Sequence, residues 1–247
     1  MDLRTPSMTL YKACLVAALA LTSSCSSSPE MIGEARAQAA GGGPIVVELF
    51  QSQGCSSCPP ANANVNALAA SRPDVLALSF AVTYWDQLGW KDTFAKPAYT
   101  ERQRAYQRSG QSDGVYTPQV VINGRKALVG ADRGTLNRAV ASVGPLRGGP
   151  TIVPDAGGVT IGAGQGAPAT VLLVTYDPRE HAIPVKAGEN NGRTLPHRNI
   201  VVGLREGGVW TGKALHVDVA KPKDPALRTA VLLQKGAGGP LLAAAKI

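Results

Sequence analysis

The sequence has 247 residues and a formal net charge of +8. The length suits one large domain or two small ones. The positive charge can favour anionic partners, but no run of five basic residues and no nucleic-acid-binding motif is present. We therefore expect no nucleic acid partner and interpret the charge as a solubility feature.

The chain begins with the pattern of a secretory leader. Arg4 and Lys12 precede a short apolar run, ACLVAALAL at 13–21, and small residues follow it. Such a run is too short to span a bilayer as a helix. We predict a signal peptide or lipoprotein leader over residues 1–25, followed by a flexible tether rich in Ser, Ala and Gly over residues 26–43.

Removal of the leader decides which cysteines remain. Cys14 lies within it, and Cys25, in TSSC, stands where a lipoprotein would be cleaved and acylated. Ala-x-Ala patterns at 35–39 fit ordinary cleavage, so a periplasmic or secreted product and one lipid-anchored at Cys25 both stay open. Only Cys55 and Cys58 are left beyond this region. With no disulfide framework available, the pair must bond to each other, bind something or react with a partner.

The first half of the remaining chain alternates strands and helices. Apolar, β-branched runs predict strands, Pro59 and Pro60 suit a first helical turn, and Asn123-Gly124 predicts a hairpin turn. Asp132 can cap the last helix. This order indicates a layered α/β domain over residues 44–145, with a helical insertion at about 84–112. The expected strands are 45–50, 75–82, 119–123 and 127–129, and the expected helices are 59–71, 97–108 and 132–143.

The composition changes after GPLRGGP at 144–150. Short strand-like segments with turn signals between them follow, and we expect a helix only at the alanine-rich C-terminal end. Residues 150–247 therefore predict a small antiparallel β-domain that resembles a sandwich. The strand-like segments are 151–161, 169–177, 199–208, 214–219 and 229–236.

The stretch GCSSCPP at 54–60 joins the first strand to the first helix and carries both cysteines. At such a junction, free backbone N–H groups and the helix dipole favour an anion. Cys55 would lose its proton more easily there, and the thiolate is the nucleophile. Cys58, one turn later, can attack the resulting mixed disulfide and release the partner. Ser56 and Ser57 carry no charge, so the helix end would do most of the tuning.

A second segment supports the same interpretation. VYTPQVVING at 115–124 opens a strand with Thr-Pro and ends at the predicted hairpin turn. With the strand–CxxC–helix arrangement, it resembles the thioredoxin superfamily over residues 41–143, and YTPQVVINGRKALVGAD is similar to the glutaredoxin end of that superfamily. The fuller pattern of VVELFQSQGCSSCPPANANVNALA, LALSFAVTYWDQLGWKDTFAKPAYTERQRAY and GVYTPQVVINGRKALVGAD resembles an exported bacterial family known as domain of unknown function 1223.

The resemblance implies roles for further residues. In the thioredoxin fold Pro118 would be cis and lie against the cysteines, while the backbone of Thr117 would pair with a bound partner. Thioredoxin-like proteins often keep a buried acid beneath the cysteines as a proton acceptor, and Glu48 would take that place. The alternative is that Glu48 faces solvent at a sheet edge. In the exported family a His and an Asp often stand where this chain has Ala81 and Thr83.

Three other features have both a functional and a structural interpretation. The aromatic stretch YWDQLGWKD at 84–92 could wall a substrate groove, but we favour a loop pinned by its tryptophans. The polar stretch ENNGRTLPHRN at 189–199 could reach the active site, but we favour a hairpin turn. The histidines His181, His197 and His216 have no ligand spacing, so we expect no metal site.

The sequence thus predicts an exported thiol-disulfide oxidoreductase without a cofactor, whose direction of reaction is not readable. The expected partners are protein thiols and disulfides or glutathione, with a membrane redox partner to recharge the pair. Two alternatives stay open. One is a Cu(I) carrier that uses both thiolates. The other is a binding module with a permanent Cys55–Cys58 disulfide, although so short a loop would give little stabilisation.

Overall fold

The computed structural model of the protein describes residues 42–247. The expected leader, including Cys25, and nearly all of the expected tether lie outside this part of the chain. Gly42–Gly43 forms a short strand, β1, which pairs antiparallel with β6, Leu146–Arg147. The last two residues of the predicted tether therefore belong to the fold.

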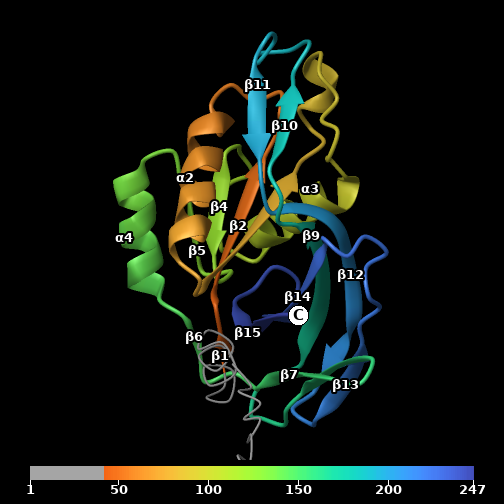
Figure 1. Cartoon of the computed structure of the whole chain (residues 1–247). Coiled ribbons are helices and arrows are strands. Elements are labelled where there is room, and N and C mark those ends of the chain that lie inside the picture. Colours follow the sequence, from red (N-terminus) through yellow and green to blue (C-terminus); the bar gives the residue numbers. More distant parts are fainter. Residues whose placement is uncertain (1–41) are drawn as a thin grey trace, which may run out of the picture.

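One mixed sheet of eight strands runs through the molecule (Figure 1). Its strand order is β15-β14-β9-β12-β3-β2-β4-β5. Only the pairs β2–β3 and β3–β12 are parallel. The strands are β2 Ile45–Gln51, β3 Val75–Ala81, β4 Gln119–Ile122, β5 Lys126–Leu128, β9 Ala169–Asp177, β12 Ile200–Trp210, β14 Arg228–Lys235 and β15 Leu241–Lys246.

Helices cover both faces of the strands from the first half of the chain. Helices α2, Cys58–Ser71, and α4, Arg133–Val143, pack on one face, and α3, Pro97–Arg108, packs on the other. Because side chains alternate along a strand, β2 supplies Val47 to the first layer and Phe50 to the second. None of the helices within residues 42–247 is long and apolar enough to cross a membrane.

The helix boundaries follow the local signals in the sequence. Pro59 and Pro60 stand in the first turn of α2, where no amide donor is needed. Helix α4 begins after Asp132, whose carboxylate accepts the N–H of Thr135 at 2.7 Å, as the capping signal predicted. The connection over residues 84–96 is irregular, as expected, apart from one 3-10 turn, η1, at Asp86–Leu88.

The C-terminal strands differ from the expected arrangement. They do not form a separate sheet, because β12 pairs with β3 through Ile200 and Ser79 and so continues the first sheet. A second, three-stranded antiparallel sheet, β13-β8-β7, packs against this extension and gives it two layers, as expected of a sandwich. Its strands are β7 Ile152–Asp155, β8 Gly158–Ile161 and β13 Leu215–Asp218.

The alanine-rich C-terminal end is a strand, so the helix expected there is wrong. Ala243, Ala244 and Ala245 in β15 are fully buried and pair with β14. Pairing with β14 and close packing against the backbone of Gly43 override the helix propensity of alanine. Glycine is required at Gly43, because a Cβ there would lie 2.0 Å from the carbonyl oxygen of Ala244.

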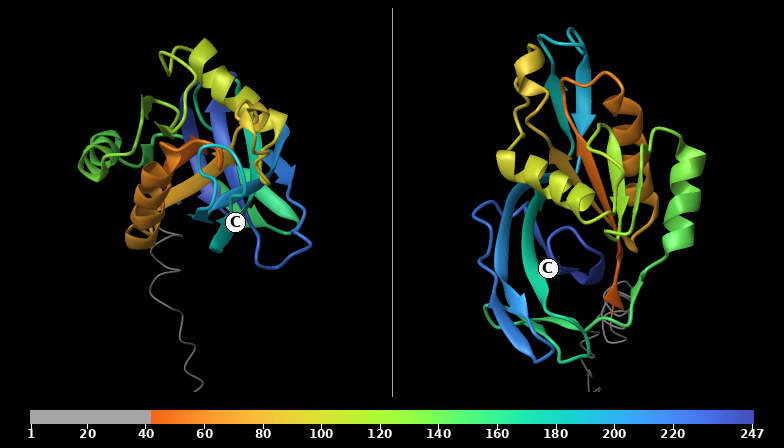
Figure 2. Two further views of the ribbon diagram at one scale, coloured as in Figure 1. Left: turned by 90° about the horizontal axis from the view of Figure 1, so that it is seen from above. Right: turned by 180° about the vertical axis from the view of Figure 1, so that it is seen from behind.

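A hairpin stands apart from both sheets. Its strands, β10 His181–Pro184 and β11 Thr194–His197, pair only with each other. In Figures 1 and 2 the hairpin rises at the end of the molecule where α2 begins. It thus carries its turn toward the cysteines.

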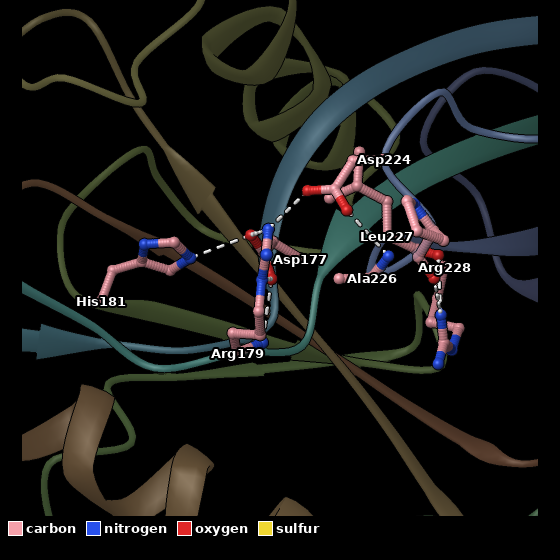
Figure 3. A network of polar contacts seen from close by, with 8 residues as sticks. Asp177, Arg179, His181, Asp224, Ala226, Leu227 and Arg228 are labelled. Carbon is pink, nitrogen blue, oxygen red and sulfur yellow. Dashed lines mark hydrogen bonds and ion pairs between the residues drawn. The ribbon is translucent and has the colours of Figure 1, made fainter.

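A network of ion pairs fixes the base of this hairpin (Figure 3). The guanidinium of Arg179 binds Asp177 and Asp224, each at 2.7 Å, and His181 Nε2 lies 2.9 Å from Asp177 Oδ2. The Arg179 and His181 hydrogen bonds hold the pKa of Asp177 well below its usual range, with Arg179 the larger cause. The end of β9, the start of the hairpin and the loop before β14 are joined here.

Candidate functional site

The two cysteines lie in and just after a tight turn between β2 and α2, the reactive turn, residues 52–57. The N–H of Cys55 donates to Ser52 O at 3.1 Å, and the N–H of Cys58 donates to Cys55 O at 3.2 Å. The side chains of Cys55 and Cys58 are 0% and 1% exposed, and both are free thiols. Helix α2 begins at Cys58, so Cys55 precedes the helix instead of standing at its first residue.

The chain brings Thr117 and Pro118 to this turn from the other side. The peptide bond between them is cis. The carbonyl oxygen of Thr117 lies 3.8 Å from Cys55 Sγ and 3.4 Å from Ser57 Oγ. The turn and the start of β4 meet because β2 and β4 are neighbours in the sheet. Four of the five predicted site residues thus lie together.

The pKa values of the two thiols are shifted in opposite directions. The pKa of Cys55 is lowered to about 6, chiefly by a hydrogen bond from the Cys58 thiol, against the effect of burial, with further help from Ser57 and Thr117. Burial raises the pKa of Cys58 well above its usual range, and the nearby Cys55 raises it further. Cys55 therefore loses its proton more readily than Cys58. This is the arrangement of a nucleophile with a second thiol in reserve.

The fifth predicted residue, Glu48, is fully buried in β2, so the alternative of a solvent-facing edge is wrong. Its carboxylate pairs with Arg102 of α3, at 2.6 Å from Nε and 3.0 Å from Nη2, and also accepts the hydroxyl of Tyr106. Arg102 in turn donates to Gln234 of β14 at 3.0 Å. No hydrogen bond joins Glu48 to either cysteine among residues 42–247, and these contacts favour a structural role for it.

The aromatic stretch at 84–92 is pinned to the domain, as we favoured, and its anchor points belong to the site. Trp85 Nε1 donates to Thr117 Oγ1 at 2.7 Å, and Trp90 Nε1 donates to Gln53 Oε1 at 2.9 Å. The N–H of Gln53 donates to Asp92 Oδ2 at 2.7 Å. Burial raises the pKa of Asp92 to about 6. Sequence reasoning missed Gln53 and Asp92, which hold the reactive turn from this side.

The polar stretch near residue 190 forms the turn of the hairpin and also reaches the reactive turn. We call residues 185–193 the hairpin tip. Asn190 Nδ2 donates to Gln53 O and to Cys55 O, both at 2.9 Å. Glu189 Oε2 accepts the N–H of Ser56 at 2.9 Å. Both interpretations of this stretch therefore hold, and the one that we had disfavoured brings it to Cys55.

The histidines are placed in structural contacts. His197 is fully buried, its Nδ1 lies 3.0 Å from Asn62 Nδ2 of α2, and burial lowers its pKa to about 4. Within residues 42–247 no group of three or more His, Cys, Asp and Glu side chains could hold a metal ion. Of the two positions where relatives often differ, Ala81 ends β3, and Thr83 Oγ1 lies 3.0 Å from Thr100 Oγ1.

Comparison with known proteins places the chain in a family. No curated protein matches it. A crystal structure of protein AGR_C_4864 from Agrobacterium tumefaciens is similar, with 33% identity and a TM-score of 0.66, and the match covers 83% of this chain and 94% of that one. HBP35 of Porphyromonas gingivalis shares the fold at 12% identity and a TM-score of 0.54, over 84% of this chain and 75% of that one. The model of the family described as protein of unknown function DUF1223 matches residues 46–234, and the chain belongs to this family.

Proposed function

We propose that the protein is a thiol-disulfide oxidoreductase with a thioredoxin-like centre at Cys55 and Cys58. The observation that carries the proposal is geometric: two free thiols stand three residues apart where α2 begins, and Cys55 Sγ lies 3.8 Å from the carbonyl oxygen of Thr117 at the cis Thr117–Pro118 bond. The pKa values of the two thiols, lowered for Cys55 and raised for Cys58, support the same assignment. A structural disulfide needs no such difference between its two thiols. A dithiol that attacks and then releases a partner does need it, because the first sulfur must be ionised while the second waits.

The reaction conserves atoms and electrons in two steps. The Cys55 thiolate attacks one sulfur of a partner disulfide, forms a mixed disulfide and expels the other partner sulfur as a thiolate. The Cys58 sulfur then attacks Cys55 Sγ, and its proton passes to the second partner sulfur, which leaves as a thiol. The partner gains two electrons and the protein loses two. The reverse sequence oxidises a dithiol partner, and the reduction potential decides which direction prevails.

The thioredoxin-like part of the proposal is supported by topology. Strand β2 leads through the cysteines into α2, β3 lies parallel beside it, and the cis Thr117–Pro118 bond opens the antiparallel strand β4 against the turn. In this proposal Thr117 and Pro118 present their backbone to the partner. The mechanism takes no step through Glu48. A role for it as proton acceptor stays a prediction, and its pairing with Arg102 favours the structural alternative.

The site of action is part of the proposal as well. The N-terminal sequence supports export to the periplasm or secretion, with or without a lipid anchor at Cys25. Protein thiols and disulfides, or glutathione, are the proposed partners, and a membrane redox protein would restore the working state of the pair.

The reduction potential of the Cys55–Cys58 pair tests the function. The leaderless protein is equilibrated in glutathione and dithiothreitol buffers, and free thiols are counted by mass after alkylation. We expect a reversible midpoint above about −250 mV, which is typical of catalytic dithiols. A pair that stays oxidised below about −300 mV would be a structural disulfide and would favour the binding module. Reduced protein that takes up one Cu(I) and resists thiol exchange would favour the carrier.

A further inference from the structure

The hairpin tip makes two contacts of different kinds with the reactive turn. Asn190 is 0% exposed, whereas Glu189, the residue before it, is exposed. Both bind backbone groups of the reactive turn. The tip therefore combines one protected contact with one that water can reach.

Asn190 is the protected contact. Its amide nitrogen has two hydrogens, and each lies on a carbonyl oxygen of the reactive turn, one of Gln53 and one of Cys55. Its amide oxygen accepts from Arg193 at 2.6 Å. The hydrogen-bonding groups of this buried side chain are thus satisfied. Separating it from the turn would remove the Asn190 hydrogen bond from Gln53 O and would leave Cys55 O with only the N–H of Cys58.

Glu189 is the exposed contact. Its carboxylate accepts the N–H of Ser56, the residue that follows Cys55. This hydrogen bond lowers the pKa of Glu189. Because water can replace the carboxylate at Ser56, the contact can open without leaving a buried group unpaired.

The tip fits closely against the aromatic stretch. Gly188 has a positive φ of +70°, and a Cβ on it would lie 3.3 Å from Cβ of Trp90. Glycine permits both the conformation and the approach. The tip thus meets the aromatic stretch on one side and the reactive turn on the other.

Cys55 itself is 0% exposed, although a partner sulfur must contact its sulfur atom in the reaction proposed above. Something at the site has to move. The strand β2, the helix α2 and the residues after Thr117 belong to the buried core. The aromatic stretch, through the partly buried Trp85 and Trp90, also holds the site from outside the core. Two exposed groups contact the turn, the Glu189 carboxylate and the hydroxyl of Ser57, which lies 3.2 Å from Cys55 Sγ.

We propose that the hairpin tip controls access to Cys55, an arrangement that we call the latch. Asn190 holds the tip at the reactive turn, and loss of the Glu189–Ser56 hydrogen bond lets the tip move and exposes Cys55. The consequence for catalysis rests on the proposed function, but the opening itself does not. The C-terminal half of the chain then has a role of its own, which is to control access to a nucleophile in the first half.

Alkylation of the reduced protein tests the latch. Neutral iodoacetamide is used over a range of pH, and modification of Cys55 is followed by peptide mass. The pH at the midpoint of the profile reports the acidity of Cys55, while the rate on the high-pH plateau reports its accessibility. For Glu189→Ala we expect the plateau rate to rise about three- to tenfold with an unchanged midpoint, as for the loss of one exposed charge-assisted hydrogen bond.

Three further variants make the test specific. Glu180→Ala removes an exposed carboxylate at the base of the same hairpin that has no hydrogen bond or ion pair within residues 42–247, and it should leave the rate unchanged. Asn190→Ala should raise the plateau rate more than Glu189→Ala does. If that variant does not fold, the Glu189 result stands alone. Ser57→Ala separates the other exposed group from the latch.

Hydrogen exchange gives a second measurement that needs no thiol chemistry. The Ser56 amide should exchange faster in Glu189→Ala than in the unaltered protein, and Glu180→Ala should show no change. An unchanged plateau rate in Glu189→Ala, a change explained by a shifted midpoint, or a rise in Ser57→Ala alone would overturn the latch. Faster alkylation together with a structural reduction potential would keep the latch and reject the proposed oxidoreductase.

Discussion

The two ends of the eight-stranded sheet bury different kinds of side chain. Strands β3, β2, β4 and β5 with their helices form the cysteine end, which buries polar groups such as Glu48, Gln53, Asp92 and Arg102. Strands β12, β9, β14 and β15 with the three-stranded sheet form the sandwich end. Its interior is built of apolar residues around Trp210.

The few buried polar groups of the second half of the chain sharpen this contrast. Asn190 binds the backbone of Cys55, His197 contacts Asn62 of α2, and Gln234 accepts from Arg102. These three therefore complete networks of the cysteine end. The comparison teaches that the second half packs mainly apolar side chains, and that three of its five buried polar residues reach the cysteine end, Asp177 and Thr229 being the others.

The largest effect is expected from the cysteines. Cys55→Ser should lower disulfide exchange by at least about a thousandfold, because the nucleophile is lost. Cys58→Ser should instead accumulate a mixed disulfide, because nothing attacks Cys55 Sγ in the second step. Mass spectrometry after incubation with oxidised glutathione detects that species. Equal turnover in Cys58→Ser and the unaltered protein would contradict the assigned roles.

The next largest effect concerns the buried ion pair between Glu48 and Arg102 in the cysteine end, whose Arg102 also donates to Gln234 of the sandwich end. Arg102→Leu leaves the Glu48 carboxylate buried without its partner and should lower the free energy of unfolding by about 3–5 kcal/mol. Arg108→Leu, which breaks the exposed pair with Glu101 on the same helix, is the matched control and should change little. Urea unfolding of both variants measures the difference. Similar losses of unfolding free energy in both variants would show that the buried Glu48–Arg102 pair stabilises the fold no more than the exposed pair does.

The sandwich end can be destabilised without changing the acidity of Cys55. Trp210 is fully buried, and Trp210→Ala should lower the free energy of unfolding by about 3–5 kcal/mol. The folded fraction should keep the same pH midpoint for alkylation of Cys55, since none of the contacts that lower that pKa comes from the sandwich end. A shifted midpoint in this variant would break the division between the two ends.

The smallest of these effects is a pH dependence. Because the pKa of Cys55 is lowered to about 6, its alkylation rate should rise about tenfold per pH unit below that value and level off above it. The free energy of unfolding should also rise with pH, because ionisation of Cys55 is easier in the folded state. The contribution of the Cys55 thiolate to the free energy of unfolding is fully present above the pKa of the unfolded thiol, and it is lost as the pH falls through about 6. Reduced protein should therefore become more stable from pH 6 toward 9, and Cys55→Ser should lack this gain in urea titrations.

Much of the cysteine end could be predicted because its signals are local. The apolar run before Gln51 predicts β2, the two prolines predict the start of α2, and Asp132 predicts the start of α4. The CxxC spacing and the Thr117-Pro118 pair likewise indicate the reactive turn without any long-range information. These features depend on a few neighbouring residues and on the period of the hydrophobic pattern.

The missing parts all depend on contacts between residues far apart in the chain. Nothing near Ile200 announces that its strand will pair with β3, and nothing near Ala244 announces a buried strand in place of a helix. The stretch around Asn190 has the composition of an ordinary turn, so its contact with Cys55 had no local signal beyond that polarity. Nothing near Glu48 indicates that Arg102 of α3, more than fifty residues later, is its partner.

The place where the chain enters the fold sets the orientation of the whole molecule. Strand β1 lies at the end of the molecule opposite the reactive turn and the hairpin tip (Figures 1 and 2). Any support that holds the protein through the residues before Gly42 would therefore hold it at the end that carries β1. The reactive turn would then lie on the side of the molecule that is away from the support.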